Sequence, residues 1–298
     1  MTIDNSQIKR WILPRPVNNE ELHDCKLNYT LQKVLCRRGI NIEAELDDYL
    51  APIELPNPEI HFRELNKATN RIIEACNNKE KIAICGDYDA DGITSTVLLV
   101  ELLSKLGGDL IPYIPSRQDD GYGLNIKMID DINRKEIKLI ITVDNGISAF
   151  DAIKKANQFD IDLIITDHHK IPDIKLDIFA LIHPERSPYN SPYKYLAGVG
   201  IAYMLANNIC KYLSFDINST SADVLFCIGT IADMAPLIGA NRKWLKYCMP
   251  KIKYTDNPAI KTIIKKLSIE NIDISSDDIG YKIAPLINAV GRIGDPKI

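Results

Sequence analysis

Ile82-Ala-Ile-Cys-Gly-Asp-Tyr-Asp-Ala-Asp-Gly92 is the stretch around which this chain is organised. The apolar run Lys81–Cys85 at its start predicts a buried parallel strand. Three acids follow at alternate positions: Asp87, Asp89 and Asp91. Gly92 breaks the extended segment, and Thr94–Leu103 has the apolar spacing of a helix. A strand, a tight turn and a helix place a ligand site at the carboxyl end of a parallel sheet.

The three acids predict a metal site. Carboxylates so close in sequence repel one another unless a cation lies between them. Ligand sets made of oxygen alone suit hard divalent cations such as Mg²⁺ or Mn²⁺. The alternative is an acidic turn that caps the following helix through Asp91 or Thr94. Capping accounts for one acid and leaves the other two unexplained.

Three later stretches supply further candidate ligands. Asp144 ends the apolar run that starts at Lys138, and Asp233 follows another apolar run. The segment Ile161–Lys170 is a third strand, and its end carries an acid and two of the chain's five histidines: Asp167, His168 and His169. Imidazole can join carboxylates around Mn²⁺, and Asp167 can orient a histidine ring. We therefore expect these side chains to gather at one edge of the sheet.

Strand-like and helix-like segments alternate from Lys81 onward, which predicts right-handed βαβ units. The candidate strands are 81–86, 109–114, 137–143, 161–166 and 177–182, and the candidate helices between them are 93–106, 125–135 and 147–157. The predicted fold class is α/β, with a mainly parallel sheet covered by helices on both faces. A helical N-terminal segment precedes it.

Outside the alternating region the chain is predicted to be mainly helical. Short helices are expected between Leu31 and Leu50, a lead-in helix packed on the first strand within 60–78, and further helices over 196–213 and 221–231. The two glycines of Gly198-Val-Gly200 would allow close packing there. This predicts an N-terminal helical segment at 1–80, a catalytic domain at 81–235 and a basic helical segment at 236–298.

Composition narrows the class of protein. Apolar residues make up 46% and charged residues 26%, which is the ordinary balance of a globular chain. No apolar run approaches the about 20 residues that span a bilayer, and the N-terminus lacks a signal-peptide pattern. Seven cysteines, with no Cys-x-x-Cys pair, fit reduced thiols in the cytoplasm.

Net charge bears on nucleic-acid binding. The formal value of −4 speaks against a generic nucleic-acid binder. However, the segment from Ala235 to Ser268 holds eight lysine or arginine residues and one acid, Asp256. A local basic face is enough to attract a phosphate backbone. The alternative is a pair of lysine-rich helices exposed to solvent.

Four motifs, in this order, resemble those of the DHH phosphoesterase superfamily: Asp-Tyr-Asp-Ala-Asp-Gly at 87–92, Val-Asp-Asn-Gly at 143–146, Asp-His-His at 167–169 and Ile-Ala-Asp at 231–233. Four more segments, at 36–40, 115–124, 196–202 and 285–292, are similar to the RecJ family of bacterial single-stranded-DNA-specific exonucleases within it. The resemblance covers nearly the whole chain.

The resemblance implies a site with two divalent cations, Mn²⁺ or Mg²⁺. Asp89 and Asp144 would hold one ion, and the ligands of the other would be Asp91, Asp144, His168 and Asp233. Asp144 would then bridge the two ions. His169 would face the scissile phosphate, and Asp87 would coordinate an ion or support the site. Cys85 stands where some members place a histidine ligand; because thiolate suits these ions poorly, it is interpreted as a packing residue.

The resemblance also implies contacts with the substrate. Arg117, Tyr122 and Arg292 match family residues near the 5′-terminal nucleotide, and Asn288 matches one that approaches the strand. An arginine fork binds phosphate well, and a tyrosine can stack on a base. Without the resemblance, Arg117 would be interpreted as a surface charge in a loop.

The function predicted in this way is metal-dependent hydrolysis of single-stranded DNA from the 5′ end, in DNA repair and recombination. A single-stranded-DNA-binding protein or a helicase is a possible partner. One alternative is a phosphoesterase that acts on short oligonucleotides, nucleoside bisphosphates or cyclic dinucleotides, and another is a non-catalytic DNA-binding relative. Because the family continues into a second domain, the sequence is expected to be a fragment, a shortened form or half of a split enzyme.

Overall fold

The computed structural model describes residues 25–41, 43–50, 54–115, 123–270 and 272–293. They fall into two compact units that divide between Glu54 and Leu55. The smaller unit contains the predicted short helices, α1 (Tyr29–Arg37) and α2 (Glu43–Leu50). Its apolar core consists of Leu35, Cys36, Ile40 and Leu46.

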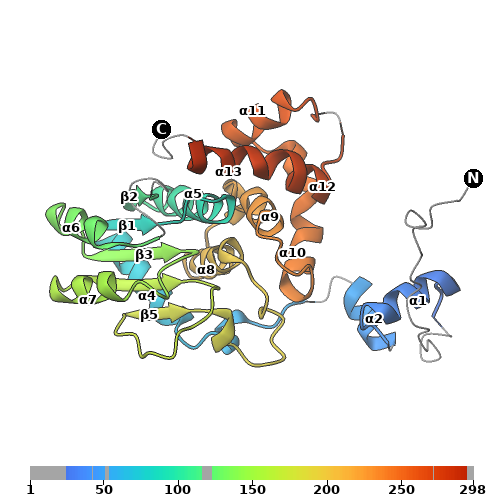
Figure 1. Cartoon of the computed structure of the whole chain (residues 1–298), viewed down its shortest axis with the longest axis horizontal. Coiled ribbons are helices and arrows are strands. Elements are labelled where there is room, and N and C mark those ends of the chain that lie inside the picture. Colours follow the sequence, from blue (N-terminus) through green and yellow to red (C-terminus); the bar gives the residue numbers. More distant parts are fainter. Residues whose placement is uncertain (1–24, 42, 51–53, 116–122, 271, 294–298) are drawn as a thin grey trace, which may run out of the picture. The chain divides into compact units, whose positions relative to one another are not determined.

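The larger unit is built on a five-stranded parallel sheet in the order β2-β1-β3-β4-β5 (Figure 1). The strands are β1 (Lys81–Cys85), β2 (Asp109–Tyr113), β3 (Leu139–Val143), β4 (Asp162–Thr166) and β5 (Ala180–Ile182). All four pairings are parallel, which confirms the predicted sheet. Four strands lie within two residues of their predicted bounds, whereas the last begins three residues later than predicted, at Ala180 instead of 177. Ala180 pairs with Ile164 of β4.

The chain reverses its direction across the sheet at β1. The helix α5 (Ala90–Lys105) leads outward to β2, whereas α6 (Ile126–Arg134) returns to β3 on the other side of β1, and α7 (Phe150–Gln158) continues to β4. In open parallel sheets, ligands bind at such a reversal, between the carboxyl ends of the diverging strands. The topology therefore predicts a ligand site between the ends of β1 and β3.

Successive residues of β1 enter two different cores. Ile82 and Ile84 join a core that contains residues of α5, whereas Ala83 and Cys85 join a core that contains residues of α6 and α7. Because both faces of the strand are buried, its sequence is a continuous apolar run. Cys85 is fully buried among these apolar side chains, which agrees with its interpretation as a packing residue.

The first core is completed by helices outside the alternating region. They are α4 (Leu65–Asn77), α8 (Gly198–Leu213) and α9 (Ala222–Ala232). The short helix α3 (Pro58–His61) has no buried residue, and short 3₁₀ helices cover Pro184–Arg186 (η3) and Ile217–Ser219 (η4). The main contacts of α4 are with α8 and β5, and its buried residues share the first core with Ile82 and Ile84 of β1. Both α8 and α9 pack along α5.

The C-terminal part of the larger unit contains only helices and their connections among its described residues. Its elements are α10 (Gly239–Cys248), η5 (Met249–Tyr254), α11 (Pro258–Lys266), α12 (Ser276–Asp278), the π-helical turn η6 (Ile279–Ile283) and α13 (Ala284–Ile293). Figure 1 shows α13 beside α5, with which it is in contact. Within the described residues, no helix combines the length and apolarity needed to cross a bilayer.

The basic segment is partly neutralised. Lys251, Lys253 and Lys261 form ion pairs with Asp223, Asp273 and Asp256, respectively. Two of these aspartates, Asp223 and Asp273, lie outside the basic segment Ala235–Ser268. At least three of its eight cations are therefore paired with carboxylates, which weakens the basic face inferred from the sequence.

The start of α5 differs from the prediction of 93–106. The helix begins at Ala90, and the Asp89 carboxylate caps it by accepting the Gly92 backbone N–H at 2.9 Å. Gly92 therefore lies within the helix and does not interrupt an extended segment. A Cβ at Gly92 would lie 2.6–2.7 Å from backbone atoms of Asp87, so glycine permits the tight approach. The capping residue is Asp89, and Asp91 lies in the first turn.

Candidate metal centre

The predicted ligands converge at the carboxyl edge of the sheet. Asp87 and Asp89 follow β1, Asp144 follows β3, and His168 follows β4. Two ligands come from helix ends instead: Asp91 lies in the first turn of α5, and Asp233 is the residue that ends α9. The ends of three strands and two helices therefore supply the site.

Three groups of side chains bring ligand atoms within 4.8 Å of one another. The groups are Asp87, Asp89 and Asp144; Asp91, His168 and Asp233; and Asp144, His168 and His169. Asp144 belongs to two of them, and it is buried at the centre of the site. The arrangement thus offers one all-carboxylate group and two groups that include imidazole.

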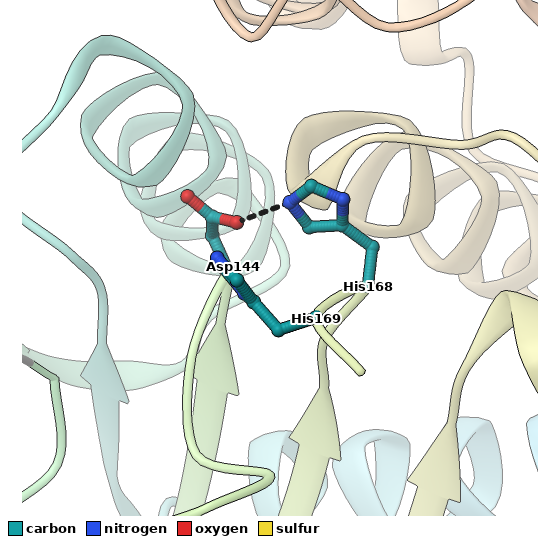
Figure 2. Close-up of side chains that lie close together, drawn as sticks. All are labelled: Asp144, His168 and His169. Carbon is teal, nitrogen blue, oxygen red and sulfur yellow. Dashed lines mark ion pairs between the residues drawn. The ribbon is translucent and has the colours of Figure 1, made fainter. Parts of the chain in front are cut away.

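The His168 ring points at the Asp144 carboxylate from the neighbouring strand end (Figure 2). Its Nε2 atom lies 3.0 Å from Asp144 Oδ1 and 3.9 Å from Asp91 Oδ2. Burial of the ring, together with the charge of His169, lowers the pKa of His168 to about 4. At neutral pH the ring is therefore uncharged, which is the state in which imidazole binds a metal.

Asp91 is oriented by the start of α8. Its Oδ2 accepts the Gly198 backbone N–H at 2.8 Å, and its Oδ1 accepts the Val199 backbone N–H at 2.7 Å. The first N–H groups of a helix have no partners within the helix. A carboxylate from the start of α5 satisfies two of them here, and its plane is fixed as a result.

Asp167 organises the histidine segment. Its Oδ1 accepts the backbone N–H groups of His168 and His169 at 2.7 and 3.0 Å, and it lies 2.7 Å from Nδ1 of the His169 ring. Its Oδ2 accepts the Ile147 N–H at 3.0 Å. This bears out the expectation that Asp167 orients a ring, which is that of His169. The bond to Asp167 raises the pKa of His169, which favours a cationic ring.

His183 is a contact that the sequence reasoning missed. It is fully buried at the end of β5, and its Nε2 lies 2.7 Å from the backbone oxygen of His169. Its Nδ1 accepts the Glu185 N–H at 3.1 Å, so the proton of the neutral ring is on Nε2 and is donated to His169. His183 thus fixes the backbone of the segment that carries the two adjacent histidines.

Asn145, directly after Asp144, ties the strand ends together. Its amide Nδ2 donates to the backbone oxygens of Cys85 and Val143, both at 2.9 Å, and its Oδ1 accepts the Leu124 N–H at 3.0 Å. The side chain is fully buried. It therefore fixes the distance between the ends of β1 and β3, which are followed by carboxylates of the site.

Of the predicted substrate contacts, only Asn288 has a described side chain. Its Oδ1 accepts the Ala90 backbone N–H at 2.7 Å, which attaches α13 to the start of α5 between Asp89 and Asp91. Arg117 and Tyr122 lie outside the described residues. Arg292 lies in α13, but its side chain is outside what the structure describes.

The carboxylates of the site are buried close to one another, so their ionised forms repel one another. Burial raises the pKa of Asp87 to about 7 and that of Asp233 to about 6, and the charge of Asp89 contributes to both. Burial also raises the pKa values of Asp91 and Asp144 well above the ordinary range, with further contributions from neighbouring carboxylates. Such a cluster is stabilised when cations compensate its charge.

The donor set fits hard divalent cations. Carboxylate oxygens predominate, a neutral imidazole nitrogen joins them, and the atoms are grouped closely enough to share ions. Asp87 Oδ1 is buried and has no hydrogen-bond partner among the residues that the structure describes. Buried polar atoms are normally paired, so an oxygen of this kind calls for a ligand.

Comparisons with known proteins agree with this geometry. The pattern of the DHH family, N-terminal domain, matches residues 81–230. The chain is 34% identical over 299 residues to the single-stranded-DNA-specific exonuclease RecJ of Bacillus subtilis strain 168, a match that covers 97% of this chain and 37% of that protein. The chain therefore spans little more than a third of the length of this curated relative.

Two solved structures are also similar. An exonuclease RecJ bound to manganese matches with 29% identity and a TM-score of 0.72, over 83% of this chain and 60% of that one. RecJ from Thermus thermophilus, in complex with Mn²⁺, matches with 26% identity and a TM-score of 0.73, over 88% of this chain and 37% of that one.

Proposed function

Because this chain belongs to the DHH family, we propose that it is a metal-dependent phosphodiester hydrolase that degrades single-stranded DNA from the 5′ end. The observation that carries the proposal is the convergence of five carboxylates and a neutral imidazole at the reversal point of the sheet. The relatives named above as single-stranded-DNA-specific exonucleases support the choice of substrate. Phosphodiester hydrolysis is a reaction for which such clusters are suited.

We assign the ligands by the grouping of their atoms. Asp87, Asp89 and Asp144 would hold one ion, and Asp91, His168 and Asp233 would hold the other. We add Asp144 to the second set because of its match to the family and because its Oδ1 lies 3.0 Å from His168 Nε2, so that it would be shared by the two ions. Mn²⁺ and Mg²⁺ are both suited to these oxygen-rich donors. When bound to these residues, two such ions would supply activation of a water molecule and compensation of charge on the phosphoryl oxygens.

His169 is assigned to the scissile phosphate. Its ring is about half exposed, with 47% of the side chain accessible, and the hydrogen bond to Asp167 both orients it and raises its pKa. A protonated imidazole can donate to a phosphate oxygen and compensate negative charge that develops there. In this assignment, His168 coordinates a metal ion, whereas His169 contacts the substrate. The two adjacent histidines therefore have different roles.

Four residues are assigned to the substrate strand by their match to the family: Arg117, Tyr122, Asn288 and Arg292. Asn288 already holds Ala90 through its Oδ1, and its amide nitrogen has no hydrogen-bond partner among the described residues. We assign that nitrogen to a backbone oxygen of the strand. The two arginines are assigned to the 5′-terminal phosphate, because their forked N–H groups match its oxygens.

The region from 81 to 235 is proposed to be the catalytic domain, flanked by an N-terminal segment (1–80) and a basic helical segment (236–298). We further propose a role in DNA repair and recombination, with a single-stranded-DNA-binding protein or a helicase as partner. A cytoplasmic location is proposed because the chain's seven cysteines are all free thiols.

The proposal is tested with the purified chain freed of metal by a chelator. Single strands and duplexes of equal sequence, labelled at the 5′ or the 3′ end, are incubated with Mn²⁺ or Mg²⁺. We expect mononucleotides to be released from the 5′ end of single strands only when metal is added. Hydrolysis restricted to dinucleotides, nucleoside bisphosphates or cyclic dinucleotides would favour the small-substrate alternative, and DNA binding without hydrolysis would favour a non-catalytic relative.

A further inference from the structure

The start of α8 differs from an ordinary helix start. The residue before it, Ala197, has no side chain that can cap the helix. The carboxylate of Asp91, 107 residues earlier in the chain than Gly198, takes the place of a cap and accepts the N–H groups of Gly198 and Val199. Helix α8 has 16 residues, and its N-terminal end carries a partial positive charge. The helix start and the Asp91 carboxylate therefore hold each other in place.

Gly198 also lies against Asp144. A Cβ on Gly198 would lie 2.5 Å from the Cβ of Asp144 and 2.8 Å from its Oδ1, which is closer than non-bonded atoms approach. The backbone of Asp144 cannot easily yield, because it already adopts a left-handed conformation with a φ of +62°. Neither can the helix start move away without lengthening the two bonds to Asp91. Glycine is therefore required at this position.

We infer that Gly198 is a positioning residue of the metal centre, where it acts on two carboxylates by two different means. Its N–H, with that of Val199, fixes the plane of Asp91. Its missing side chain leaves the space in which Asp144 turns its carboxylate toward His168. The inference rests on the proposed function, since it takes Asp91 and Asp144 as ligands.

The two backbone bonds leave Asp91 able to bind an ion. A carboxylate has about four lone-pair sites, and the amides of α8 occupy two of them. Asp91 Oδ2 lies 3.9 Å from His168 Nε2, and ligand atoms of Asp91, His168 and Asp233 lie within 4.8 Å of one another. The helix start thus fixes one side of the carboxylate while another side faces the proposed ligands.

Gly200 provides a matched control in the same helix turn. The three atoms nearest to a Cβ there all belong to the side chain of Leu196, at 3.0–3.6 Å, so no residue of the site lies as close as Asp144 does to Gly198. The sequence predicts close packing for both glycines, but only Gly198 contacts proposed ligands. If the glycines served helix packing alone, alanine at the two positions would affect metal binding equally little.

The test compares Gly198→Ala and Gly200→Ala with the unaltered full-length chain. The readouts are Mn²⁺ affinity, from the loss of the free-ion EPR signal on titration into metal-free protein, and the melting temperature without metal. We expect Gly198→Ala to weaken Mn²⁺ binding at least about tenfold, since groups that orient metal ligands contribute about 10- to 100-fold. Gly200→Ala should keep Mn²⁺ affinity within about twofold of the unaltered chain.

A second variant keeps the inference testable if Gly198→Ala does not fold. Val199→Pro removes the other N–H donor to Asp91, and proline is tolerated in the first turn of a helix because its missing N–H has no partner within the helix. It should also weaken Mn²⁺ binding. A folded Gly198→Ala or Val199→Pro protein with unaltered Mn²⁺ affinity would overturn the inference. Failure of the unaltered chain to bind Mn²⁺ would instead refute the proposed function on which it rests.

Discussion

His168 Nε2 lies 3.0 Å from Asp144 Oδ1, across the gap between the ends of β4 and β3. The ring is neutral because burial and the charge of His169 lower the pKa of His168 to about 4. The contact therefore joins a nitrogen of a neutral ring to the buried carboxylate of Asp144. This carboxylate also belongs to the group that it forms with Asp87 and Asp89. This makes Asp144 the residue through which the two proposed ion sites are connected.

Replacement of Asp144 tests that connection. Asp144→Ala should reduce hydrolysis of single-stranded DNA by more than about a hundredfold, since groups that merely orient ligands already contribute about 10- to 100-fold. Mn²⁺ binding should weaken at both sites. Asp173→Ala, an exposed aspartate on the loop between β4 and β5, is the control and should leave both quantities unchanged. Near-normal activity of Asp144→Ala with Mn²⁺ would refute the shared-ligand assignment.

His183 is expected to act on the reaction without touching the substrate. His183→Ala removes the bond to the His169 backbone oxygen, so the segment that carries His168 and His169 loses a restraint. We expect kcat to fall about tenfold or more and Mn²⁺ affinity to weaken, as for other groups that orient ligands. His61→Ala, which removes a ring that packs on Tyr193, serves as the control for loss of a histidine. Equal kcat in the two variants would leave His183 with a purely structural role.

Arg117 is predicted to recognise the end of the strand. Arg117→Ala should raise KM for 5′-phosphorylated strands about tenfold, because a hydrogen bond to a charged group contributes about 1.5–3 kcal/mol. Strands with a 5′-hydroxyl should be affected less. Arg134→Ala, an exposed arginine on α6, is the control. Equal losses on the two kinds of strand would refute a phosphate contact.

The sequence was sufficient to predict the residues that end the strands. Apolar runs followed by Asp87, Asp144 and His168 predict a parallel sheet with a site at its carboxyl edge, and the structure has this sheet. The pattern is visible because burial on both faces demands continuous apolar runs, so each acid after a run stands out.

The contacts that orient these residues could not be predicted in this way. The bonds from Gly198 and Val199 to Asp91 use backbone N–H groups, which every residue type except proline carries. His183 meets His169 only because β5 pairs with β4. One signal was present: an apolar helix that opens with glycine and lacks a polar capping residue must find its cap elsewhere.

Without bound metal, the free energy of unfolding of the chain should fall as the pH rises. Burial raises the pKa of Asp87 to about 7 and that of Asp233 to about 6, against about 4 in an unfolded chain. Between these values the folded state binds more protons than the unfolded state, so stability falls as pH rises. The raised pKa of His169 acts in the same direction, whereas the lowered pKa values of His168 and His183 oppose it.

We therefore expect the melting temperature of the metal-free chain to fall by several degrees between pH 5.5 and 8. Carboxylates with lowered pKa values, such as Asp131 at about 2, are ionised throughout this range and contribute no slope. Saturating Mn²⁺ should remove or reverse the trend, because bound cations favour the ionised carboxylates and displace their protons. Asp87→Asn and Asp233→Asn should each flatten the metal-free slope. A metal-free melting temperature that rises steadily over this range, in the unaltered chain and both variants alike, would contradict the assigned burial of charge at the site.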